Sequence, residues 1–170
     1  MSVVDRCKQR FFSIFVVLGF LVGLSGAYAQ EGQPLLTISG DISGTEPMVL
    51  DAEALLDLPQ VEIRTSTLWT DGLETFSGPS LMDVLALAGA GSGDLELIAL
   101  NDYSVILPRD LVEPSAPILA IHRNGERFSV RDKGPLWVIF PFDRSNRYRT
   151  EQVYALSVWQ LAEISVSPAE

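Results

Sequence analysis

The N-terminal segment decides how much of this chain is available to fold. Residues 6–10 carry three cations, residues 11–24 form a largely apolar run, and Ala27-Tyr28-Ala29 has the small-residue pattern of a cleavage site. This pattern predicts a secretory signal peptide over residues 1–29, because a membrane-spanning helix needs about 20 apolar residues. We therefore expect one domain over residues 30–170, secreted to the periplasm. A retained membrane anchor is the alternative.

The composition of the remaining 141 residues restricts the chemistry available to the domain. The only cysteine, Cys7, lies in the expected leader, so the mature domain has no disulfide and no thiolate. It must be stabilised by its hydrophobic core alone. The net charge of −10 becomes −12 once the three leader cations and Asp5 are removed. We expect no nucleic-acid partner for so acidic a domain, and no metal cluster in a chain with one histidine.

The order of the expected elements favours an α+β fold. Apolar periodicity and turn residues predict strands over residues 35–38, 61–65, 95–100, 103–107, 118–123, 127–130, 136–140 and 158–166. Helices are expected over residues 52–58, capped by Asp51 and ended by Pro59, and over residues 81–88. Asn124-Gly125 predicts a β-hairpin. Because strands and helices alternate irregularly, mixed β-sheets with short helices are favoured over a doubly wound sheet.

Most standard catalytic sites are excluded. A serine triad could use only His122, which lies beside the expected hairpin turn. Gly89, Gly91 and Gly93 follow a helix and lack the spacing of a nucleotide-binding loop. The three tryptophans are expected in the core.

One region of the acidic chain is basic. Residues 123–149 contain seven cations and three anions, a net charge of +4. This asymmetry predicts a local site for an anion, centred on residues 131–141. The alternative is that each cation pairs with an acidic neighbour and has no further role.

Several segments, taken in order, carry a family resemblance. They are Leu36-x-x-x-Gly40 followed by Pro47, Leu50, Leu55 and Pro59; Phe76-x-Gly78-x-x-Leu81-x-Asp83-x-Leu85; Asn101-Asp102-Tyr103-Ser104 with Pro108; Asn124-Gly125; and Lys133-Gly134-Pro135-Leu136. Together they resemble the oxidoreductase molybdopterin-binding domain, the fold of sulfite oxidase. The resemblance implies a sulfite-oxidase-like fold for nearly all of the mature chain. It also implies a pocket bordered by Thr65, Trp69, Asp102, Tyr103, Arg131, Lys133 and Gly134.

The resemblance fails at one position. In the family, one protein cysteine a few residues before a tryptophan holds molybdenum, whereas the matching stretch here is Thr65-Ser66-Thr67-Leu68-Trp69. A neutral hydroxyl cannot replace a soft thiolate. Molybdopterin is therefore a cofactor that the resemblance allows, and molybdenum is not expected.

Three functional hypotheses follow from these observations. The favoured one is a periplasmic protein of this fold that binds a small anionic ligand or a partner, such as a membrane sensor or redox protein, without molybdenum redox chemistry. The second is a molybdopterin-dependent oxidoreductase with a non-cysteine metal ligand. The third is a structural or assembly module. Whether the protein is an enzyme is left open.

Overall fold

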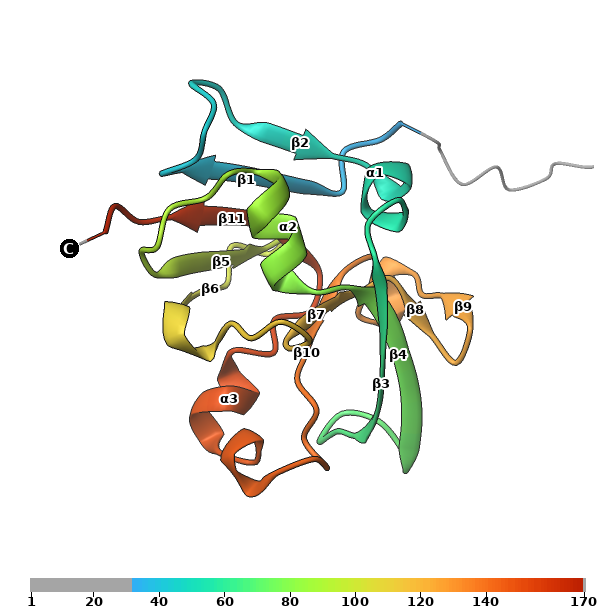
Figure 1. Ribbon diagram of the computed structural model, residues 1–170. Helices are drawn as coiled ribbons and strands as arrows, with labels where there is room; N and C mark the ends of the chain where they lie inside the picture. The colour runs from blue at the N-terminus through green and yellow to red at the C-terminus, as the bar shows by residue number, and fades with distance from the viewer. Residues whose placement is uncertain (1–31, 170) are drawn as a thin grey trace, which may run out of the picture.

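A five-stranded sheet forms one side of the molecule, which the computed structural model describes over residues 32–169 (Figure 1). The expected signal peptide lies outside the described residues. The strands, in spatial order, are β2 (Met48–Leu50), β1 (Leu36–Gly40), β11 (Leu161–Val166), β5 (Leu95–Ala99) and β6 (Ser104–Leu107). Only the β1–β11 pair is parallel, so the sheet is mixed.

Alternation along these strands directs one face of the sheet to the core. Leu36, Ile38, Leu97 and Ile164 are buried, whereas their chain neighbours are more exposed. The helix α2 (Leu81–Leu87) contributes its apolar face to the same core. Its start is fixed by Ser80, whose hydroxyl accepts a hydrogen bond from the Asp83 backbone N–H at 3.0 Å.

Two smaller sheets form the rest of the domain. The first has four strands, in the spatial order β3 (Gln60–Ser66), β4 (Leu73–Pro79), β8 (His122–Arg123) and β9 (Glu126–Arg127). The second pairs β7 (Ile118–Ala120) with β10 (Trp137–Ile139). The long β3–β4 hairpin extends away from the five-stranded sheet, and its turn lies on the same side as α3 (Glu151–Ala155) (Figure 1).

The structure confirms several expected elements and corrects others. Asp51 caps α1 (Ala52–Leu56), although the helix ends before residue 58. The Asn124-Gly125 hairpin is present. However, the strand expected over residues 127–130 ends at residue 127, and a 3-10 helix, η2 (Val130–Asp132), follows it. There the N–H groups of Asp132 and Gly134 both bond locally to the Ser129 carbonyl, so this backbone needs no sheet partner.

Other elements were not predicted from the sequence. Four of them are short: β2, α3, η1 (Arg109–Leu111) and η3 (Asn146–Tyr148). Each has at most five residues, too few for a clear apolar period. The seven-residue strand β4 was also not predicted, because it has few apolar residues and ends in Gly78-Pro79, a pair typical of turns. The fold class is nevertheless confirmed: the chain is a single α+β domain with mixed sheets and short helices.

Candidate functional site

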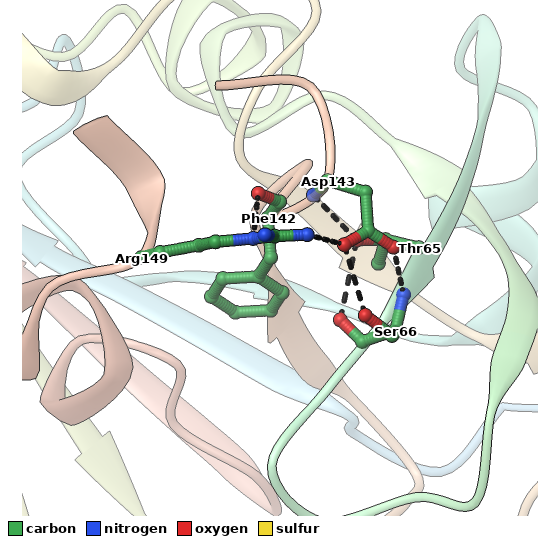
Figure 2. Close-up of polar contacts among 5 residues, drawn as sticks. All are labelled: Thr65, Ser66, Phe142, Asp143 and Arg149. Carbon is green, nitrogen blue, oxygen red and sulfur yellow. Dashed lines mark hydrogen bonds and ion pairs between the residues drawn. The ribbon is translucent and has the colours of Figure 1, made fainter. Parts of the chain in front are cut away.

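The residue at the expected metal-ligand position is part of a polar junction. Thr65, near the end of β3, is completely buried. Its hydroxyl oxygen accepts a hydrogen bond from the Asp143 backbone N–H at 3.1 Å and donates one to the Ser66 carbonyl at 3.2 Å (Figure 2). The hydroxyl therefore joins β3 to the segment that follows β10, and both its donor and an acceptor position are in use.

The carboxylate of Asp143 completes this junction. It accepts hydrogen bonds from the Ser66 backbone N–H at 2.6 Å and from the Ser66 hydroxyl at 2.9 Å, and it forms an ion pair with Arg149. Arg149 also donates from Nε to the Phe142 carbonyl at 3.0 Å (Figure 2). The Ser66 backbone N–H, supported by Arg149, holds the pKa of Asp143 below its usual value.

An aromatic pocket of about 320 Å³ lies elsewhere, between the turn that joins β5 to β6 and the segment after α3. Four rings from three parts of the chain contribute to its wall, together with small and polar residues. The lining residues are Trp69, Ala99, Asn101, Tyr103, Tyr154, Ala155, Ser157, Val158 and Trp159. No charged side chain is among them, so the pocket itself favours an apolar, planar guest.

Trp69 brings the β3–β4 turn onto this pocket. Its ring centroid lies 5.5 Å from that of Trp159 and 6.0 Å from that of Tyr154, in edge-to-face geometry. The turn is held by the Thr67 hydroxyl, which accepts from the Trp69 backbone N–H at 3.0 Å and bonds to the Thr70 hydroxyl at 2.8 Å. The wall of the pocket is therefore set by side-chain packing and by a hydrogen-bonded turn.

A cation lies against the same group of rings. The ammonium nitrogen of Lys133 is 5.8 Å from the ring centroid of Trp159 and 5.9 Å from that of Trp137. Among the described residues Lys133 belongs to none of the three ion pairs. Because Trp159 also lines the pocket, this ammonium adds positive charge next to an otherwise neutral cavity.

The conformation after η2 places Lys133. Lys133 adopts a left-handed backbone with φ of 73°. The next residue must be glycine, because a Cβ on Gly134 would lie 2.0 Å from the Phe128 carbonyl oxygen. Gly134 is thus buried and positions the loop, but it does not line the pocket.

The remaining expected site residues lie apart from the cavity. Arg131 is exposed on η2, and Asp102 is exposed in the β5–β6 turn with a φ of 63°. Asp102 nevertheless separates two lining residues, Asn101 and Tyr103. Of the seven expected residues, Trp69 and Tyr103 share the pocket and Lys133 adjoins it through Trp159.

The basic region does not converge on one point. Three of its seven cations pair with carboxylates from different parts of the chain: Arg123 with Glu74, Arg147 with Glu113, and Arg149 with Asp143. The alternative of individual ion pairs therefore describes these three, and Lys133 is the cation placed against the aromatic group.

Sequence analysis missed two rings of the pocket wall. Trp159 was expected in the core but is 36% exposed, and Tyr154 lies on the unexpected helix α3. Thr150, whose hydroxyl accepts from the Val153 backbone N–H at 3.2 Å, is followed by an acidic residue and is a helix-start signal that could have revealed α3. Within residues 32–169 there is no group of three or more His, Cys, Asp and Glu side chains suited to a metal ion, and no helix long and apolar enough to span a bilayer.

Comparison with known proteins supports the fold alone. No family model matches the sequence, and no curated protein matches it. The structure is similar to that of the sulfane dehydrogenase SoxCD from Paracoccus pantotrophus, with a TM-score of 0.60 and 20% sequence identity. The match covers 78% of this chain and 37% of the other, so the chain spans well under half of that protein. The comparison confirms the expected sulfite-oxidase-like fold.

Proposed function

We propose that this protein is a periplasmic ligand-binding protein, which holds a small planar anion in the aromatic pocket and performs no molybdenum redox chemistry. The observation that carries this proposal is the pairing of the aromatic cavity with the Lys133 ammonium, 5.8 Å from the Trp159 ring centroid.

The pocket wall supports the planar part of the ligand. Trp69, Tyr103, Tyr154 and Trp159 offer ring faces and edges, and an aromatic contact adds about 0.5–1.5 kcal/mol beyond area burial. Indole N–H groups can only donate hydrogen bonds, and Asn101 supplies a further amide. Such a wall suits a ligand whose polar atoms are acceptor oxygens.

Lys133 supports the charge of the ligand. A carboxylate or phosphate at the Trp159 side of the cavity would be attracted by this ammonium, whereas a cation would be repelled. This attraction acts from beside the cavity, because Lys133 lies against Trp159 and does not itself line the pocket.

The metal-dependent alternative has less support. The side chain that would replace the metal-binding cysteine is Thr65, which is fully buried and hydrogen-bonded to Asp143 and Ser66. To reach a metal it would have to leave both partners unsatisfied, and a neutral hydroxyl is a poor ligand for a soft site. Thr65 therefore does not fit the role of the missing cysteine.

The binding proposal is tested by fluorescence titration of the mature protein with benzoate and with a pterin phosphate, following the tryptophan emission. Saturable quenching by either anion is expected, with binding weakened about tenfold or more in Trp159→Ala. Leu73→Ala is the control, because Leu73 is exposed and outside the lining. The proposal fails if neither anion binds, or if both variants bind as the wild type does.

The location is tested separately. N-terminal sequencing of protein recovered from the periplasmic fraction is expected to begin at Gln30, after the Ala27-Tyr28-Ala29 pattern. Recovery of the intact leader in the membrane fraction would show that the segment is an anchor.

A further inference from the structure

Within residues 32–169, no strand pairs with the outer edge of β6. Strand β6 is the last of the five-stranded sheet and pairs on one side with β5. The Ala99 backbone N–H bonds to the Tyr103 carbonyl at 2.9 Å, so Ala99 and Tyr103 form a hydrogen-bonded pair. Because hydrogen-bonded and non-hydrogen-bonded pairs alternate, the backbone groups of Ser104 and Ile106 point away from β5, toward the free edge.

The strand β6 is short, with four residues, but it carries none of the sequence features that protect a free strand edge. Edge strands usually carry lysine, proline or a bulge, which prevent pairing with another chain. None of these occurs within Ser104–Leu107, and the strand pairs with β5 in an unbroken register. Instead, three of the exposed large apolar side chains of residues 32–169 surround it: Leu100, Tyr103 and Ile106 are 56%, 46% and 52% exposed.

The charge around β6 is negative. Between residues 94 and 110 there are four carboxylates and one cation, Arg109. The carboxylates are Asp94, Glu96, Asp102 and Asp110, and none takes part in the ion pairs of the described residues. Glu96 lies directly opposite Ile106 across the β5–β6 pair. A chain that approached this edge would meet uncompensated negative charge.

We propose that β6 is a docking edge for an extended, basic segment of a partner protein, which adds to the five-stranded sheet as a sixth strand. The backbone groups of Ser104 and Ile106 supply the main-chain hydrogen bonds, and the exposed apolar side chains contact alternate residues of the added strand. The four carboxylates favour a partner segment that carries lysine or arginine between its apolar residues, and their charge raises the rate at which that segment associates with the protein. This docking edge shares Tyr103 with the aromatic pocket, but it does not depend on the ligand proposed for that pocket.

The probe is a synthetic peptide of about six residues, the usual length of a strand, with alternating lysine and valine; the control peptide replaces lysine by glutamate. We expect the lysine peptide to bind the mature protein, to slow amide hydrogen exchange at Ser104 and Ile106, and to weaken as salt is added. Ile106→Pro removes an outward N–H at an edge position that tolerates proline, and it should weaken binding about tenfold or more. Ile106→Ala keeps that N–H and should lose only a few-fold in affinity.

Three results would overturn the proposal. One is equal binding of the glutamate peptide. Another is binding by Ile106→Pro that matches Ile106→Ala. The third is a concentration-dependent dimer of the protein alone that protects Ser104 and Ile106 from exchange, since the edge would then serve a second copy. If Ile106→Pro fails to fold by circular dichroism, the exchange measurement on the wild type decides: unprotected amides at Ser104 and Ile106 with the peptide bound reject the docking edge.

Discussion

The hydroxyl oxygen of Thr65 lies 3.1 Å from the backbone nitrogen of Asp143 and accepts its hydrogen bond, although 78 residues separate the two in sequence. The bond is partly shielded from water, because Thr65 is fully buried whereas Asp143 is exposed. It fixes the end of β3 against the segment after β10. The position that the family resemblance assigns to a metal ligand thus has a structural role in this chain.

Thr65→Val should destabilise the protein by about 1–3 kcal/mol, because a near-isosteric apolar side chain leaves the Asp143 N–H without its partner. Urea unfolding followed by circular dichroism measures the change. Thr37→Val on β1 is the matched control, since Thr37 takes part in none of the side-chain hydrogen bonds of the described residues and lies in a strand. Equal unfolding midpoints for the two variants would contradict a structural role for the Thr65 hydroxyl.

The same geometry predicts the metal content. Protein purified from the periplasm of cells that make the pterin cofactor should contain far less than one molybdenum per chain by elemental analysis, because Thr65 cannot leave its two hydrogen bonds without cost. Stoichiometric molybdenum would revive the oxidoreductase hypothesis. In that event Thr65→Cys should change the spectrum of the metal, whereas Thr67→Cys should not.

Asp143 should contribute to the acid arm of the stability profile. Its pKa is lowered in the folded protein, chiefly by the Ser66 backbone N–H, so the contribution is fully present above the unfolded value of about 4 and is lost as the pH falls through the folded pKa. Asp143→Asn removes this titration. We expect the variant to be less stable than the wild type at neutral pH, with a difference that shrinks below about pH 4.

Urea midpoints of both proteins at a series of pH values test this expectation. Asp132→Asn is the comparison, because Asp132 is exposed on η2 and accepts from the Ser129 hydroxyl at 2.8 Å without an ion pair. A constant difference between wild type and Asp143→Asn across the acid range would show that the network is not coupled to the charge of Asp143.

The sequence predicted the parts of the fold that depend on local signals. Asp51 predicts the start of α1, and Asn124-Gly125 predicts the β8–β9 hairpin. Alternating or continuous apolar residues predict β1, β3 and β10. It did not predict the end of β9, because the local bonds of Ser129 that replace sheet pairing depend on Gly134 approaching the Phe128 carbonyl. This is a tertiary contact, and it produces no periodic pattern of apolar residues from which it could be predicted.

The candidate site was predictable only in part, for the same reason. The resemblance indicated Trp69 and Tyr103, and both line the pocket. Tyr154 and Trp159 approach them from the C-terminal part of the chain, and nothing local marks an exposed tryptophan as part of a cavity wall. The count of cations indicated an anion site, but charge counting cannot show that Arg147 and Arg149 pair with Glu113 and Asp143.

The final prediction separates two cations that sequence analysis treated alike. Lys133→Ala should weaken the binding of a pterin phosphate or benzoate about tenfold or more, since its ammonium lies against Trp159 of the pocket. Arg131→Ala should lose less, because Arg131 is exposed and, unlike Lys133, lies against none of the aromatic rings around the pocket. Calorimetry on both variants makes the comparison, with Arg144→Ala as an exposed control and circular dichroism to confirm folding. If Arg131→Ala proves as damaging as Lys133→Ala, the anion is held by the loop around residues 131–133 rather than in the aromatic pocket. If all three variants bind as the wild type does, the positive charge next to Trp159 only stabilises the packed rings.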